Sequence, residues 1–138
     1  KENLVRWKIT SDMSCTHCKG IETIAHALLY CPEVNLFWKN VKFFICTQFK
    51  VNMTIDEKLL FTGFEIEDKD MIIPNIILTF AQYTIYRVNM LSKFTSKQFN
   101  SFSLVTELKK DLNINLKFLE KKRFIILTKN QLADIQAL

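Results

Sequence analysis

The chain has 138 residues, of which 49% are apolar, so it is long enough for one domain with a buried core and is not compositionally disordered. Two glycines and two prolines are too few for a turn-rich β fold, and they favour helices. Four cysteines exclude a disulfide scaffold, while a net charge of +5 permits contact with nucleic acid without requiring it.

The first expected elements are an extended arm, a turn and a short helix. Residues 1–14 are predicted to be extended because Trp7 and Ile9 occupy alternate positions. The C-x2-C sequence at 15–18 predicts a tight turn, and apolar residues at helical spacing predict a helix over 22–30. The start lacks both a methionine and the apolar run of a signal peptide, so we expect an intracellular piece of a longer protein.

A second helix is expected from Pro32 to about residue 50. The residue before a proline avoids the α region, whereas proline itself suits the first position of a helix. Apolar residues then recur at steps of three and four, which predicts an amphipathic helix. They are Val34, Phe37, Trp38, Val41, Ile45 and Phe49.

A short third helix is expected next, with Thr54 as its N-cap, Asp56 and Glu57 in its first turn and Gly63 as its stop. The sequence "FEIEDKD" that follows predicts an acidic loop.

Two long helices are expected in the remaining sequence. Residues 71–91 are apolar almost all round, which is typical of a buried central helix. Their length also permits a membrane span, but prolyl and amide side chains interrupt the run, so we expect no membrane contact. From about Gln98 a last helix is expected, with a break at Asn115 and apolar positions at Val105, Leu108, Leu112 and Leu119.

The predicted fold class is therefore mainly α, with a small zinc knuckle followed by a helical bundle. Residues 1–52 would form the zinc-binding knuckle with its following amphipathic helix. Residues 53–138 would form a helical C-terminal region packed as one domain with it.

Three cysteines and a histidine have the spacing of a metal site. Cys15 and Cys18 bring two thiols to one turn, and His26 and Cys31 follow at positions from which a second pair closes a Cys3His set. Four protein ligands leave no open position, so the expected Zn2+ would be structural rather than catalytic. A disulfide among the cysteines and a chance placement of free thiols are the alternatives.

His17 is a rival ligand, and Cys46 is the remaining cysteine. His17 lies inside the C-x2-C turn and rivals His26, but a residue in that position usually points away from the metal and is exposed. Cys46 lies among apolar residues of the second helix, where a cysteine is typically a small buried hydrophobe.

The segment from Cys15 to Trp38 resembles the zinc-binding segment that follows the reverse transcriptase of non-LTR (LINE-type) retrotransposons. That family has two cysteines, a Glu-Thr pair ahead of a histidine, a further cysteine followed by proline, and a tryptophan soon after. More loosely, "WKIT" and "IILTFAQYTIYRVNM" resemble its lead-in and its closing helix. The matching residues are Cys15, Cys18, Glu22, Thr23, His26, Cys31, Pro32 and Trp38.

The resemblance implies an accessory domain that binds RNA or target DNA of the element while an upstream reverse transcriptase of the same polyprotein primes synthesis. It implies an intracellular ribonucleoprotein, in the nucleus or the cytoplasm. Tyr30 and Trp38 would then either stack on bases or pack in the core. Candidate nucleic-acid-binding residues, for which a solvated surface is the alternative, are Lys19, Lys39, Lys42, Lys121, Lys122 and Arg123.

The sequence contains no pattern typical of an active site. There is no Tyr-x-Asp-Asp polymerase motif, no glycine-rich phosphate loop and no arrangement of nucleophile and base. We therefore expect no catalytic residue. The alternative function is a structural or protein-interaction module, a remnant of a retroelement that does not bind nucleic acid.

Overall fold

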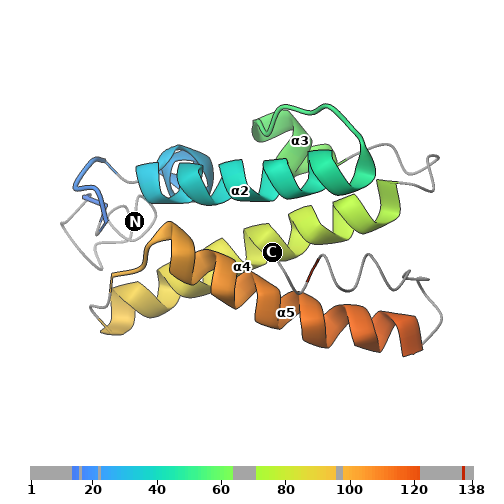
Figure 1. Cartoon of the computed structure of the whole chain (residues 1–138). Coiled ribbons are helices and arrows are strands. Elements are labelled where there is room, and N and C mark those ends of the chain that lie inside the picture. Colours follow the sequence, from blue (N-terminus) through green and yellow to red (C-terminus); the bar gives the residue numbers. More distant parts are fainter. Residues whose placement is uncertain are drawn as a thin grey trace.

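In the computed structural model, the part of the chain that is described is mostly helical (Figure 1). The residues it describes are 14–15, 17–21, 23–63, 71–95, 98–121 and 135. The predicted arm, apart from Ser14, the acidic loop, Glu22, Lys122 and Arg123 lie outside the described residues.

The elements follow the predicted order. They are η1 (His26–Tyr30), α2 (Pro32–Phe49), α3 (Glu57–Thr62), α4 (Ile72–Thr95) and α5 (Ser101–Lys121). In the described part of the chain, extended pairing is limited to one antiparallel bridge between Ser14 and Ile21. The predicted mainly α fold, with a cysteine-histidine cluster ahead of a helical bundle, is confirmed.

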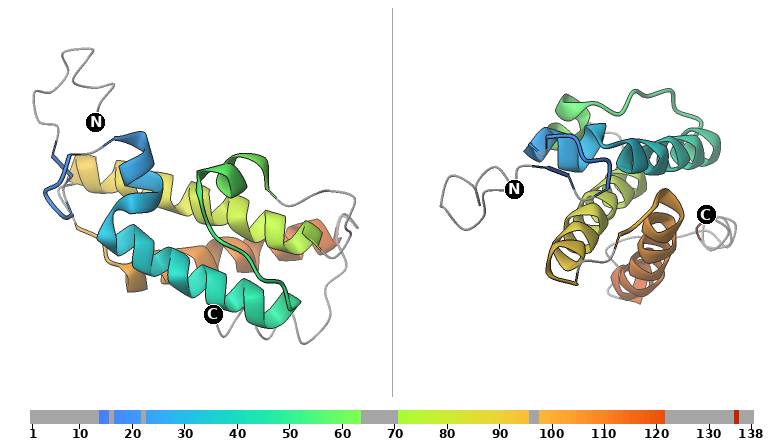
Figure 2. Two further views of the ribbon diagram at one scale, coloured as in Figure 1. Left: turned by 90° about the horizontal axis from the view of Figure 1, so that it is seen from above. Right: turned by 90° about the vertical axis from the view of Figure 1, so that its left-hand side faces the viewer.

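Helices α2, α4 and α5 form a three-helix bundle in which each helix contacts the other two (Figures 1 and 2). The short helix η1 packs on α2 and α4, and α3 packs on α4. The cysteine-rich turn therefore lies at the end of the bundle where α2 begins (Figure 1).

Helix α2 begins and ends where the sequence predicts. Pro32 is its first residue, and the chain leaves the helix at Lys50, whose φ of 52° is left-handed. Its inner face buries the predicted apolar residues with two differences: Phe44 is buried as well, and Phe49 is only half-buried.

Helix α3 begins two residues later than predicted. Its N-cap is Asp56 rather than Thr54, and the Asp56 carboxylate accepts a hydrogen bond of 2.8 Å from the Leu59 N–H. The helix stops at Gly63 as predicted, because Gly63 has a φ of 68° that other residues rarely adopt.

Helix α4 is the expected central helix, although only part of its surface is buried. It buries Ile77, Ala81 and Ile85 completely, whereas Tyr83 and Tyr86 are more than half exposed. Among the described residues, no helix is long and apolar enough to cross a bilayer.

Helix α5 runs without the break predicted at Asn115. The Asn115 Nδ2 donates to the Asp111 carbonyl at 2.8 Å, so this amide bonds within the helix instead of ending it. At the start of α5, Asn100 and Ser103 cap each other reciprocally through their side chains and backbone amides. The buried seam of α5 repeats every four residues and comprises Leu104, Leu108, Leu112 and Leu116.

One hydrophobic core connects the cysteine-rich turn with the bundle. Cys15 and Cys31 are each 1% exposed, and they belong to the same buried cluster as Trp38, Ile85 and Leu108. Apolar packing therefore holds the cysteine-rich turn against the helices.

Candidate metal centre

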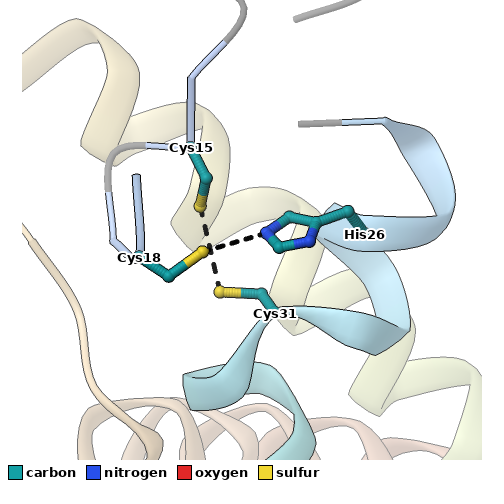
Figure 3. A group of neighbouring side chains, drawn as sticks. All are labelled: Cys15, Cys18, His26 and Cys31. Carbon is teal, nitrogen blue, oxygen red and sulfur yellow. Dashed lines mark hydrogen bonds between the residues drawn. The ribbon is translucent and has the colours of Figure 1, made fainter. Parts of the chain in front are cut away.

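The first two sulfur atoms are presented by a backbone-bonded turn. The Cys15 N–H donates to the Gly20 carbonyl at 2.6 Å, and the Lys19 N–H donates to the Cys15 carbonyl at 3.0 Å. Lys19 adopts a left-handed φ of 61°, which closes the turn directly after Cys18. The chain therefore folds back within six residues, and both cysteine side chains lie on its inner side (Figure 3).

The other two ligand candidates come from the short helix η1 and its end. In the turn that leads into this helix, the Thr23 Oγ1 accepts a hydrogen bond of 3.0 Å from the His26 N–H. The Cys31 N–H donates to the His26 carbonyl at 2.8 Å, a bond from residue i+5 to residue i that defines a π turn. The wide turn places His26 and Cys31 on the same side, which an α-helix would not do at this spacing.

The structure brings all four predicted ligand residues together (Figure 3). Every pair of their ligand atoms lies within 4.8 Å. The Cys15 and Cys31 sulfurs are 3.8 Å apart, and the Cys18 sulfur is 3.2 Å from the His26 Nε2. These residues are close enough to hold a metal ion.

Two of these separations fit a tetrahedral ion. With metal–sulfur bonds of about 2.3 Å and metal–nitrogen bonds of about 2.0–2.1 Å, two sulfurs are about 3.8 Å apart and a sulfur and a nitrogen about 3.5 Å. The observed 3.8 Å and 3.2 Å separations lie close to both values. Hydrogen bonding alone also joins these atoms in pairs, but it does not require all four to converge on one point.

The surroundings of Cys31 disfavour its thiolate in the metal-free cluster. Burial, followed by the nearby Cys15, raises the pKa of the Cys31 thiol to about 12. The backbone amides of Glu33 and Val34 at the start of α2 act in the opposite direction and lower this pKa. A divalent cation held by the four residues would favour the deprotonated Cys31 sulfur, as the two amides already do.

Several contacts fix the ligand-bearing segments on the bundle. The Trp38 Nε1 donates to the Leu28 carbonyl at 2.8 Å, which ties the end of η1 to α2. The Glu33 carboxylate accepts a hydrogen bond of 3.0 Å from the Ser101 N–H, which ties the start of α2 to α5. Sequence reasoning missed this role of Glu33, because nothing in the local sequence shows which distant amide a carboxylate meets.

His17 is half-buried, so the prediction that it is exposed on the turn is wrong. Its ring centroid lies 3.7 Å from that of Phe99, and its Nε2 lies 3.3 Å from the Ser92 Oγ on α4. These contacts occupy the imidazole outside the four-residue cluster. Cys46 lies half-buried against the core, consistent with a small apolar role.

The predicted nucleic-acid-binding residues do not form one cluster. Lys19 lies exposed on the cysteine turn, and Lys39 and Lys42 lie on α2. Lys121 is the last residue of α5, at the opposite end of the bundle from the cysteine turn (Figure 1).

The two aromatic residues near the cluster have different surroundings. Trp38 is 2% exposed and is a core residue, so it cannot stack on a base. Tyr30 is exposed, and its hydroxyl donates to the Glu57 Oε1 at 3.0 Å. The Glu57 contact raises the pKa of Tyr30.

Fold and site together define a small helical domain with a candidate Cys3His metal centre at one end of its bundle. Comparisons with protein-family models, with curated proteins and with solved structures find no match for the chain.

Proposed function

We propose that this chain is a zinc-stabilised accessory domain that assists a retrotransposon reverse transcriptase in binding RNA or target DNA. The observation that carries the proposal is the convergence of three sulfurs and one imidazole nitrogen within 4.8 Å. This donor set suits zinc rather than magnesium or calcium, which prefer oxygen ligands. Four protein ligands also make a closed site, so the metal's contribution is to structure.

The chain's own residues determine what the metal would stabilise. Cys15 and Cys18 would hold the turn, and His26 and Cys31 would hold the π turn that precedes α2. The amides of Glu33 and Val34 favour the Cys31 thiolate, and the His17 N–H donates to the Cys15 sulfur at 3.4 Å. Metal binding would thereby stabilise the packing of the cysteine turn against the end of the three-helix bundle.

The nucleic-acid part of the proposal is supported by the resemblance of residues 15–38 to the retrotransposon segment. It is also supported by lysines on several elements, of which Lys19, Lys39 and Lys121 are exposed. The partners would be element RNA or DNA and an upstream reverse transcriptase domain, inside an intracellular ribonucleoprotein. The chain would contribute binding and no catalytic group. Its described residues that would meet phosphate are Lys19, Lys39, Lys42 and Lys121.

A protein-interaction module is the alternative, and one observation favours it. An open cavity of about 510 Å3 lies between η1, α3 and α4, and most of its lining is apolar. Phe61 on its edge is 93% exposed.

The proposal is tested by metal analysis and gel-shift assays on the same purified protein. We expect about one zinc per chain under reducing conditions. RNA and DNA should each be shifted at low salt and much less at high salt, because each neutralised phosphate releases counterions. A metal-loaded protein that binds neither nucleic acid near physiological salt would contradict the nucleic-acid role and support the alternative.

A further inference from the structure

The outward face of α2 carries an exposed aromatic ring and an exposed lysine, with a second, half-buried lysine one turn from the first. Phe43 is 73% exposed, whereas Phe37 and Phe44 on the same helix are buried. Lys39 precedes Phe43 by four residues, so the two side chains are neighbours on the helix surface, and Lys42 is adjacent in sequence. Leu36, 47% exposed, lies two turns before Phe43. We call Leu36, Lys39, Lys42 and Phe43 the α2 face.

The charge on this helix favours a polyanion. Glu33 is the acidic residue of α2, and its carboxylate is engaged by the Ser101 N–H of α5. The remaining charged side chains of α2 are Lys39 and Lys42, and the exposed Lys50 follows at its C-cap. No free carboxylate on α2 therefore offsets the charge of Lys39 and Lys42.

We propose that the α2 face binds single-stranded nucleic acid, with phosphates on Lys39 and Lys42 and a base stacked on Phe43. The inference rests on the proposed function and names the strandedness and the residues of the contact. In a duplex, the flat faces of the bases are covered by their neighbours, so a ring on a convex helix surface reaches only sugars and phosphates. An unpaired base offers its flat face, and stacking on an aromatic side chain tolerates any base.

The test uses the full, zinc-loaded chain and fluorescence anisotropy with a labelled 15-nucleotide oligouridylate, its DNA counterpart, and an RNA duplex of equal length. Phe43→Ala should weaken binding to the single strands by roughly 5- to 100-fold and leave duplex binding unchanged. Phe43→Trp should restore it. The matched control is Phe102→Ala, because Phe102 on α5 is 78% exposed and has no lysine within four residues.

The lysines are tested through the salt dependence of the same binding. Replacing Lys39 and Lys42 by alanine should reduce the slope of log affinity against log salt by about 0.7 for each lysine, whereas Phe43→Ala should leave the slope unchanged.

The outcomes separate this inference from the proposed function. If wild-type protein binds single strands and Phe43→Ala binds them equally well, the α2 face is not the site and the proposed function stands. If Phe43→Ala weakens binding to single strands and to the duplex equally, the α2 face is not specific for single-stranded nucleic acid. If the zinc-loaded wild type binds no oligonucleotide, the proposed function and this inference both fail.

Discussion

The indole N–H of Trp38 donates to the backbone carbonyl of Leu28 at 2.8 Å, so a core residue of α2 holds the last turn of the helix that carries His26. Trp38 is 2% exposed and packs against Phe37, with ring centroids 5.5 Å apart. This partly buried hydrogen bond joins residues ten positions apart, and it ties the segment that carries His26 and Cys31 to the bundle.

Trp38→Phe should lower the free energy of unfolding by about 1–3 kcal/mol, because it leaves the Leu28 carbonyl without its buried donor. Trp38→Ala should cost about 3–5 kcal/mol, because it also removes most of the ring volume. Denaturant unfolding of the metal-loaded proteins measures both values. A Trp38→Phe variant as stable as the wild type would show that this hydrogen bond does not hold η1 in place.

Each of the four clustered residues should be needed for the metal. Cys15→Ser, Cys18→Ser, His26→Ala and Cys31→Ser should each lose the roughly one equivalent of zinc, because three remaining ligands bind a structural zinc far more weakly. Metal analysis after gel filtration measures this loss. The matched controls are His17→Phe, which retains a ring beside Phe99, and Cys46→Ala, and both should keep the metal. Loss of zinc from His17→Phe together with its retention by His26→Ala would reverse the ligand assignment.

The cluster and the helices were predictable from local sequence, because ligand spacing and apolar periodicity are both local patterns. Features that depend on distant contacts were not predictable in this way. The sequence predicted Thr54 as the cap of α3, whereas the structure uses Asp56, whose backbone is extended and whose carboxylate accepts from the Leu59 N–H. Asn115 interrupts the apolar pattern, yet α5 continues because its side chain bonds the Asp111 carbonyl. The burial of His17 depends on Ser92 and Phe99, which lie far along the chain.

The metal-free protein should lose stability as the pH rises. Folding raises the pKa of Cys31 from an ordinary value of 9.0 to about 12, so above pH 9 the unfolded chain binds fewer protons at this thiol than the folded chain does. Stability that is fully present below pH 9 is therefore lost progressively as the pH approaches 12. Unfolding of the chelated protein between pH 7 and 10.5 should show this decline, and metal-free Cys31→Ser should show a smaller one. Identical pH profiles for the two metal-free proteins would exclude Cys31 as the cause.

The metal-loaded protein should respond to pH in the opposite direction, because zinc binding requires deprotonated thiols and a neutral imidazole. Acid should release the metal, and zinc-release titration with a chromogenic chelator measures this. Metal retained down to pH 4 would contradict a site built from Cys and His ligands.

Arg87 should contribute to the pairing of α4 with α5. Its Nη2 lies 3.0 Å from the Glu107 Oε2 and 3.0 Å from the Asp111 Oδ2, and all three side chains are at least two-thirds buried. Arg87→Met should cost between about 1 and 3 kcal/mol, because it removes the guanidinium that pairs with both carboxylates. The matched control is Lys110→Ala, whose exposed ion pair with Glu107 should contribute less than about 0.5 kcal/mol.

The same ion pair sets a dependence on acid. The hydrogen bond from Arg87 is the main cause that lowers the pKa of Glu107 in the folded protein. The stability that ionised Glu107 contributes is therefore present above the pKa that this carboxyl has in the unfolded chain. It is lost as the pH falls through the lower pKa of the folded protein. Arg87→Met should flatten this acid limb of the unfolding profile. An unchanged acid limb would show that Glu107 titrates alike in both proteins.

The two glycines should differ in their tolerance of alanine. Gly63 ends α3 with φ 68° and ψ −172°, a region that is essentially restricted to glycine, and an added Cβ would lie 2.8 Å from the Asn75 Oδ1. Gly63→Ala should therefore cost about 1–3 kcal/mol. A Cβ at Gly20 would make ordinary contacts of 3.5 Å with the Cys18 sulfur and 3.7 Å with the His26 ring, so Gly20→Ala should retain both stability and zinc. Thermal unfolding and metal analysis of the two variants measure the difference, and a Gly63→Ala protein as stable as Gly20→Ala would show that α3 ends without using this backbone conformation.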